Sequence, residues 1–206
     1  MPKVLTHEEV LCFRDRMCDH ALVAFGKYGV EGISLRGLAA DLSCSRTTPY
    51  RYFKNKADIL AALRQREYGR IADTLEAALA QESDTSKQLQ AILKAYIQFA
   101  IQHPDSYRVM YTVAQPDSAQ YAGLEAEILR SAQPMRQVVR ISVEAGIMLG
   151  EPADIFHILW AGLHGLISLH LADLIGNKQD FDQLATVMTD ALVRAVSSRV
   201  NKHAVA

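Results

Sequence analysis

Residues Ser34–Phe53 read SLRGLAADLSCSRTTPYRYF and contain two short helical patterns separated by a polar bend. Ser34 is a favourable N-cap residue for a first helix, predicted over 34–42. The polar run Ser43-Cys44-Ser45 ends that helix, and its last serine can cap a second helix over 46–52. This order of elements predicts a helix-turn-helix. The apolar positions of the first helix, which recur at helical spacing, are Leu35, Leu38, Ala39 and Leu42.

The second helix of this pair is dense in side chains that reach outward. They are Arg46, Thr47, Thr48, Tyr50, Arg51 and Tyr52. Between Ser34 and Lys56 five cations accompany a single acid, Asp41. A basic helix with hydroxyl and guanidinium groups suits the major groove of DNA. The alternative is an ordinary solvated, charged helix.

The same stretch resembles the DNA-binding domain of the tetracycline-repressor (TetR) family over Ala21–Leu63. The matching residues are Ala24, Phe25, Gly29, Ile33-Ser34, Leu38-Ala39, the run Ser45–Phe53, Lys56, Ile59 and Leu60. Two positions depart from the family pattern, since the turn carries Ser43 where a glycine is usual and Cys44 where a valine is usual. Ser43 would have to accept a left-handed or bridge conformation, at a cost of about 1 kcal/mol.

These observations assign roles in DNA contact. Base edges are expected to be read by Ser45, Arg46, Thr47, Thr48 and Arg51. Ser34, Tyr50, Tyr52 and Lys56 are expected at phosphates, and the resemblance supports the last three in that role. Arg36 is a further candidate cation, or a surface residue only. Tyr52 and Phe53 could instead belong partly to the core.

Composition points to an all-α protein, because half of the 206 residues are hydrophobic and only 6 are proline and 11 glycine. Residues 1–70 carry a balance of +4 and residues 71–206 a balance of −5, so a basic end adjoins an acidic body. Cys12, Cys18 and Cys44 show no metal-ligand spacing and are expected as free thiols. The polar N-terminus lacks a signal-peptide pattern, and a cytoplasmic location is expected.

The chain order predicts a helix-turn-helix domain over 1–55, a connecting helix over 56–81 and a helical effector-binding and dimerisation domain over 82–206. A capping box at Thr6–Glu9 is expected to begin the first helix. Further helices are predicted over 86–103, 104–114, 121–148, 152–175 and 180–200, and Pro134 predicts a kink or a break.

The segment 152–175 is apolar on nearly every face between Ile155 and Ala172. Such a helix is buried on all sides or spans a membrane, and its three histidines argue against the membrane. We expect it to pack with the helix over 180–200 against a second copy, forming a four-helix dimer interface. Gly162 and Gly165 would permit close approach of another helix. The WAGLHG run, with Trp160 and His164-Gly165, resembles the Trp-His-Gly type of C-terminal domain in the same family.

Members of that family usually respond to a small molecule bound in the second domain. Candidate effector contacts are aromatic or polar-tipped residues: Tyr96, Phe99, Tyr107, Met110, Tyr111, Trp160 and His164. The alternative for each is plain core packing. No catalytic motif, cofactor or metal site is predicted, and the pair His157 and His164 is too little for a metal. Cys44 is either a redox sensor or, as we favour, a small apolar turn residue.

The predicted function is therefore a ligand-responsive transcriptional repressor that binds a palindromic operator as a homodimer. A transcriptional activator of the same fold remains open. A helical small-molecule-binding protein or enzyme without DNA binding is the alternative from another class.

Overall fold

The computed structural model describes residues 6–111, 120–176 and 180–197, and within these ranges the regular secondary structure is helical, joined by turns and loops. Only an isolated bridge between Met148 and Ser197 has extended pairing there. The all-helical prediction is confirmed. The α-helices are α1 (His7–Tyr28), α2 (Leu35–Asp41), α3 (Lys56–Ala80), α4 (Thr85–Gln102), α5 (Pro104–Tyr111), α6 (Ala122–Glu144), α7 (Pro152–Leu171) and α8 (Phe181–Val196), with short 3-10 turns η1 (Val30–Gly32) and η2 (Pro49–Arg51).

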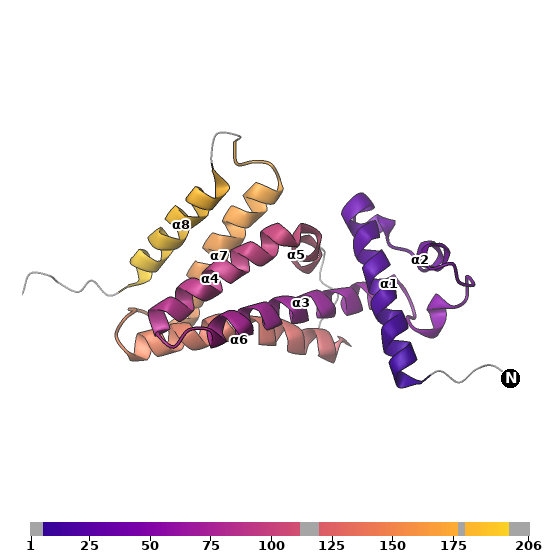
Figure 1. Ribbon diagram of the computed structural model, residues 1–206, viewed down its shortest axis with the longest axis horizontal. Coiled ribbons are helices and arrows are strands. Elements are labelled where there is room, and N and C mark those ends of the chain that lie inside the picture. The colour runs from indigo at the N-terminus through magenta and orange to yellow at the C-terminus, as the bar shows by residue number, and fades with distance from the viewer. Residues whose placement is uncertain (1–5, 112–119, 177–179, 198–206) are drawn as a thin grey trace, which may run out of the picture. The chain divides into compact units, whose positions relative to one another are not determined.

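The helices form two compact units, each built from two stretches of chain (Figure 1). The N-terminal unit comprises Met1–Arg70 with His103–Leu129, and the C-terminal unit comprises Ile71–Gln102 with Arg130–Ala206. The helices α3 and α6 therefore contribute residues to both units.

Capping contacts lie at both ends of α1, and those at its start were predicted from the sequence. The amide of Glu9 donates to the Thr6 hydroxyl at 3.1 Å, and the Thr6 amide donates back to the Glu9 carboxylate at 2.9 Å. At the other end Gly29, with φ 65°, places its amide 2.7 Å from the Phe25 carbonyl. A positive φ favours glycine at this position. The predicted capping box is thus confirmed.

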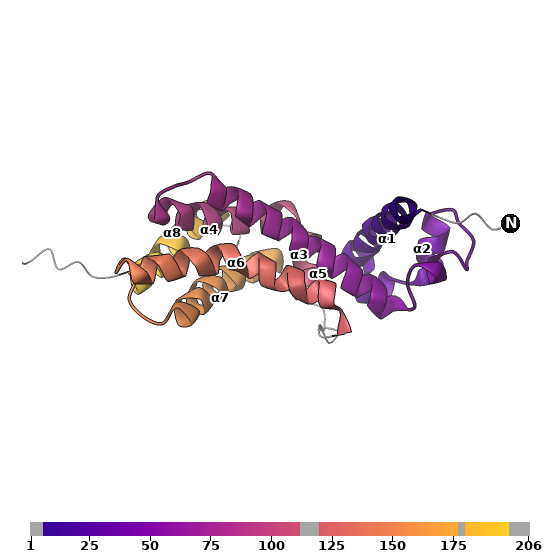
Figure 2. The same ribbon diagram turned by 90° about the horizontal axis from the view of Figure 1, so that it is seen from below.

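The core of the N-terminal unit joins α1, α2, α3 and α5. Figure 2 shows the short α2 lying beside α1. Its buried apolar residues come from distant parts of the sequence, and include Met17, Ile33, Leu38, Phe53, Ile59, Leu63 and Val109. This core holds the helix-turn-helix against the first turns of α3.

In the C-terminal unit α7 packs against α4 and α8. Its buried positions are all apolar: Ile155, Phe156, Leu159, Leu163, Leu166 and Ile167. Each of the predicted helices beyond residue 81 is present with ends shifted by a few residues, where the chain is described. Pro134 lies inside a single helix, α6, so the predicted alternative of a break into two helices is wrong. None of the helices in the described ranges has the length and apolar character that a membrane crossing needs.

Candidate nucleic-acid interface

Ser34 lies at the start of α2, and Ser43 lies just after its end, where the chain turns into the exposed segment that follows. The Ser34 hydroxyl accepts from the Gly37 amide at 3.0 Å, as its predicted capping role requires. Ser43 adopts φ 51°, a left-handed conformation that is unfavourable for a residue with a Cβ atom. The amide of Cys44 then donates to the Ala39 carbonyl at 3.0 Å. The strained turn expected at Ser43 is confirmed.

The segment 45–53, which we call the reading segment, differs from its prediction. A helix was expected over 46–52, but the structure has turns and the single 3-10 turn η2. Pro49 supplies the reason, because proline has no amide proton to donate to the Ser45 carbonyl. That carbonyl instead accepts from the Thr48 amide at 2.9 Å, an i to i+3 bond. The reading segment is therefore helical in sense but only about a turn long.

Most of the predicted DNA-contact residues are exposed on this surface. Ser34, Arg36, Ser45, Arg46, Thr47, Tyr50 and Arg51 are exposed, and Thr48 is half-buried. The Ser45 hydroxyl lies 3.1 Å from that of Thr47 and 2.8 Å from that of Thr48. These three hydroxyls thus form one small cluster. Two exposed guanidinium groups, on Arg46 and Arg51, accompany it.

Tyr52 is less exposed than Tyr50 of the same segment. It is half-buried, and its ring stacks on Phe13 of α1 with 4.4 Å between centroids. Phe53 is buried, as the alternative interpretation of these two residues expected. Sequence reasoning did not assign Arg14 of α1, whose guanidinium donates to the Tyr52 carbonyl at 2.6 Å and lies 4.2 Å from the Phe53 ring centre. No local pattern could reveal this contact, because its partners are 38 positions apart.

Lys56, at the first position of α3, pairs with Glu31 of η1 at 3.3 Å. Glu31 is almost fully exposed, so this is a surface ion pair and its contribution to stability is small. A phosphate near Lys56 would compete with the Glu31 carboxylate. Asn55 caps the same helix end, since its side-chain oxygen accepts from the Asp58 amide at 3.0 Å.

Cys44 is half-buried and packs against the apolar core of the N-terminal unit. This placement suits the small apolar turn residue that we favour. Among the described residues, no group of three or more histidine, cysteine or acidic side chains is arranged to hold a metal ion.

The seven candidate effector residues fall into two groups. Tyr107, Met110 and Tyr111 belong to α5 in the N-terminal unit, where the Met110 carbonyl accepts from Arg64 at 3.1 Å and from Tyr68 at 3.2 Å. Tyr96, Phe99, Trp160 and His164 belong to the C-terminal unit.

In the second group the Trp160 indole donates to the Tyr96 hydroxyl at 3.1 Å, and its ring centre lies 5.7 Å from that of His164. Burial lowers the pKa of His164, so this imidazole is held neutral at physiological pH. Tyr96 and Phe99 are buried, whereas Trp160 and His164 are half-buried. The group therefore offers aromatic surface and hydrogen-bonding tips rather than charge.

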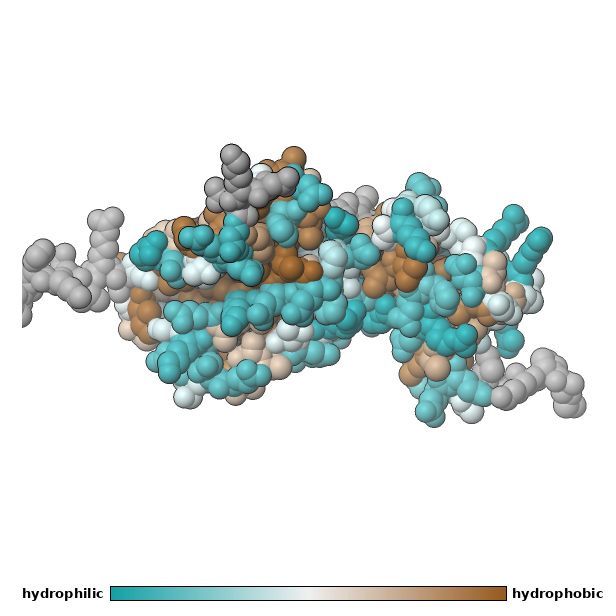
Figure 3. Space-filling view, turned by 45° about the horizontal axis from the view of Figure 1, so that its top comes forward, coloured by the Kyte–Doolittle hydropathy of each residue, from teal (hydrophilic) through white to brown (hydrophobic). Residues whose placement is uncertain are grey.

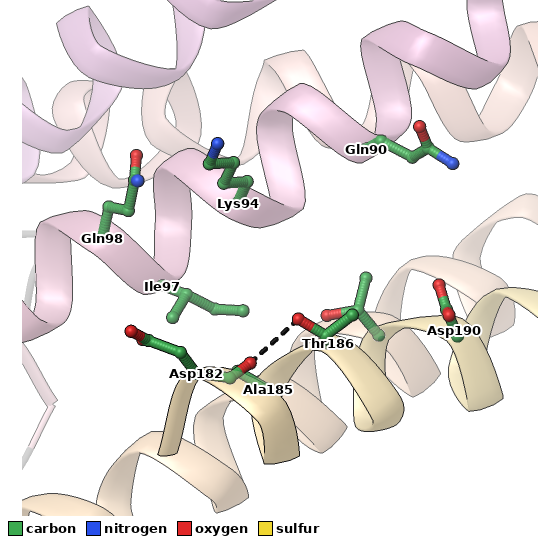
Figure 4. Close-up of a pocket in the computed structure, with 9 residues that line it drawn as sticks. Gln90, Lys94, Ile97, Gln98, Asp182, Ala185, Thr186 and Asp190 are labelled. Atoms are coloured by element: carbon green, nitrogen blue, oxygen red, sulfur yellow. Dashed lines mark hydrogen bonds between the residues drawn. The ribbon is translucent and has the colours of Figure 1, made fainter. Parts of the chain in front are cut away.

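A groove of about 420 Å³ runs between α4 and α8 of the C-terminal unit (Figure 4). The Ile97 side chain lies between α4 and α8, and the Lys94 ammonium and Gln98 amide point away from α8. None of the seven candidates lines this groove, which is bounded by Gln90, Lys94, Ile97, Gln98, Asp182, Ala185, Thr186, Thr189 and Asp190.

Helices α7 and α8 expose apolar residues in helical stripes, and Figure 3 shows hydrophobic surface gathered on the C-terminal unit. Ile158 and Leu169 of α7 and Val187 of α8 are each about half exposed. The two glycines of α7 differ in their surroundings. A Cβ atom at Gly162 would lie 2.7 Å from Leu192 of α8, whereas one at Gly165 would meet nothing within 4 Å. Gly162 thus serves packing inside the chain, and Gly165 faces open space.

The sequence matches two models of known protein families. Residues 18–63 match the family model described as bacterial regulatory proteins, tetR family. Residues 89–192, half of the chain, match a second model described as Tetracyclin repressor-like, C-terminal domain.

Individual proteins are similar to this chain in sequence and in fold. An uncharacterized HTH-type transcriptional regulator of Mycobacterium tuberculosis is 27% identical over 146 residues, which cover 70% of this chain and 61% of the relative. The match therefore spans about three fifths of the length of that curated relative. A protein of unknown function from Rhodococcus sp. RHA1 has a TM-score of 0.79 at 24% identity, covering 90% of this chain and 95% of that one. A tetR-family regulatory protein from Rhodococcus RHA1 has a TM-score of 0.71 at 16% identity, with coverages of 89% and 96%. At these identities the solved structures show a shared fold.

Proposed function

Since this chain belongs to the TetR family of transcriptional regulators, we propose that it represses transcription by binding a palindromic operator as a homodimer, and that a small-molecule effector releases it. We place this action in the cytoplasm, where the chain meets duplex DNA. The Trp-His-Gly subtype of its C-terminal domain stays a prediction.

The exposed, basic reading segment is the observation that supports DNA binding most directly. Arg46 and Arg51 can each donate two parallel hydrogen bonds to a guanine, and the Thr47 and Thr48 methyl groups can contact thymine. Ser45 completes the base-reading set. Ser34, Arg36, Tyr50 and Lys56 are proposed at phosphates, together with the less exposed Tyr52. The net charge of +4 over residues 34–56 supplies the sequence-independent part of the affinity.

The apolar stripes of α7 and α8 support the proposed homodimer. Ile158, Leu169 and Val187 would be buried by a second copy, and Gly165 would allow close approach of a partner helix. Two α7–α8 pairs would then form a four-helix interface. A symmetric dimer of this kind would place its two reading segments in successive major grooves, about 34–36 Å apart.

Release by an effector is proposed to act through α3, because this helix contributes residues to both units. The proposed contacts are the seven candidates, with Tyr96, Trp160 and His164 as the first to examine. An effector that moves α3 would change the separation of the two reading segments and lower operator affinity.

The test is selection of bound duplexes from a random pool with the purified full chain, followed by titration of the selected duplex at several salt concentrations. We expect a palindrome, and a logarithmic salt slope of several units because several phosphates are neutralised. Arg46→Ala should relax base preference and weaken binding by about tenfold or more. Arg140→Ala is the matched control, since Arg140 is an exposed arginine of α6 in the C-terminal unit. Equal behaviour of the two variants, or no retention of any duplex, would contradict the proposal.

A further inference from the structure

Near the end of the reading segment, the Tyr52 carbonyl has no hydrogen-bond donor within the short helical turn η2. The amides of Arg51, Tyr52 and Phe53 donate back to Thr48 and Pro49 at 3.0–3.1 Å, so the turn closes on itself. The chain then passes to α3, which begins at Lys56. The Tyr52 carbonyl therefore lies beyond the last hydrogen bond of η2, where the last carbonyls of a helical turn need other donors.

Arg14 of α1 supplies that donor from a distant part of the sequence. Its Nη1 atom donates to the Tyr52 carbonyl at 2.6 Å, a short bond of the charge-assisted kind. The same guanidinium lies over the Phe53 ring, 4.2 Å from its centre. Arg14 is half-buried, and its planar group lies against the end of the reading segment.

A second contact from the same turn of α1 acts on the same residue. Phe13 stacks on the Tyr52 ring with 4.4 Å between centroids and 29° between planes. Neighbouring residues of α1 thus hold both the carbonyl and the side chain of Tyr52. At the other end the reading segment is fixed by the left-handed turn at Ser43. Both ends of the segment are therefore fixed, and between them Pro49 provides no amide donor for an i to i+4 bond to the Ser45 carbonyl.

We propose that Arg14 is a positioning residue for base reading: it holds the end of the reading segment so that Arg46 and Arg51 keep the spacing that their bases require. This inference rests on the proposed function. A regular helix would keep that spacing through its own i to i+4 bonds. In this chain η2 is a single turn, so the spacing depends on the brace from α1.

Arg16 offers a control for the positive charge of Arg14. It lies two residues further along α1, is exposed, and its guanidinium is 5.9 Å from the Phe13 ring centre. Replacing either arginine by glutamine removes one positive charge from the same helix. Only Arg14→Gln removes the bond to the Tyr52 carbonyl. A general electrostatic effect on DNA binding would therefore appear in both variants, whereas loss of positioning would appear only in Arg14→Gln.

The experiment compares the full chain with Arg14→Gln, Arg14→Lys and Arg16→Gln. For each, the affinity for the selected operator is divided by the affinity for an unrelated duplex of equal length at the same salt. We expect Arg14→Gln to lower this ratio by about tenfold or more, because a hydrogen bond from a charged group is lost. Arg14→Lys should restore affinity for the unrelated duplex but not the ratio, since an ammonium cannot lie flat on Phe53 while it donates to Tyr52. Arg16→Gln should keep the wild-type ratio.

Amide hydrogen exchange of the free proteins gives a second measurement that needs no DNA. We expect exchange at Arg51, Tyr52 and Phe53 to become faster in Arg14→Lys and to stay unchanged in Arg16→Gln, while α2 keeps its protection in both. A wild-type ratio in both Arg14 variants overturns the proposal, and so does unchanged exchange in Arg14→Lys. If the wild-type chain itself prefers no duplex, the proposed function fails together with the inference that rests on it.

Discussion

The N-terminal unit buries two charged side chains of α3, Arg64 and Glu67, whereas the C-terminal unit is built around α7, whose buried positions are apolar. Hydrogen bonds and ion pairs are directional, so they fix where one helix lies on another. Apolar packing depends mainly on area and shape. The unit with the proposed reading surface thus adds buried directional contacts of α3 to its apolar core, whereas the central helix of the other unit is buried by apolar packing alone.

The largest expected effect tests the buried carboxylate of Glu67. Its two oxygens accept from Arg66 at 3.0 Å and from Arg70 at 2.8 Å, and Arg66 also bonds Asp19 of α1 at 2.7 Å. Glu67→Gln should lower the free energy of unfolding by about 3 kcal/mol, because the buried carboxylate accepts charge-assisted hydrogen bonds from two arginines, each worth about 1.5 kcal/mol or more. Urea unfolding followed by circular dichroism measures this change.

Glu76 on the same helix is the matched control. It pairs with Arg130 at 2.8 Å in the C-terminal unit and is nearly half exposed. Glu76→Gln should cost less than about 1 kcal/mol, as surface pairs do. Equal losses in the two variants would show that the contrast between the units is wrong.

The second prediction concerns the two glycines of α7. Gly162→Val should lower the free energy of unfolding by about 2 kcal/mol, because the new side chain would overpack against Leu192. Gly165→Val should leave it nearly unchanged when both proteins are monomeric, since nothing lies within 4 Å of the added Cβ atom. Fluorescence of Trp160, the single tryptophan, reports unfolding of this unit.

The same pair of variants separates folding from dimerisation. Analytical ultracentrifugation should show that Gly165→Val dimerises more weakly than the wild-type chain, because the proposed interface needs close helix approach there. A Gly165→Val protein that dimerises normally would remove the support that this glycine gives to the proposed interface.

The third and smallest prediction is that the two units lose stability at opposite ends of the pH range. Burial raises the pKa of the Cys18 thiol in the N-terminal unit from 9.0 to about 11, and nearby Arg66 offsets part of this. The unfolded chain releases the proton above about pH 9 while the folded chain retains it, so stability falls as pH rises. The loss should reach about 1 kcal/mol near pH 10. Cys18→Ala should remove the contribution of this thiol, and Cys12→Ala, at an exposed thiol of the same helix, should leave the loss unchanged.

At acid pH the C-terminal unit should respond through His164. Burial lowers the pKa of His164. Below about pH 6.5 the unfolded chain therefore binds a proton more readily than the folded chain, and the free energy of unfolding decreases as the pH is lowered. Trp160 fluorescence during urea unfolding at pH 5 and pH 7.5 measures this loss. His164→Gln should reduce the difference in the free energy of unfolding between the two pH values. His157→Gln, at an exposed position of α7, should leave this difference unchanged. If His164→Gln keeps the full difference, the assignment to this imidazole is wrong.

Local signals predicted the fold well, and particular residues show why. Thr6, Ser34 and Asn55 each cap a helix through a contact with a residue three positions on, so sequence spacing alone could identify them. The reading segment was the exception. Its exposed residues were predicted, but the helix expected to carry them is shorter than predicted. Pro49 has no amide proton to donate to the Ser45 carbonyl, and this lost hydrogen bond outweighed the helical pattern of the sequence.

The sequence by itself determined the helices outside the reading segment, several of their caps and the basic surface, because these depend on neighbours within one or two turns. Only the tertiary structure decided which distant groups meet. Arg14 reaches the Tyr52 carbonyl across 38 positions, and Arg64 reaches the Met110 carbonyl across 46. Such partners depend on the path of the whole chain, so residue spacing carries no signal for them. The tertiary structure likewise separated the seven candidate effector residues into two groups, which their shared aromatic character gave no means to predict.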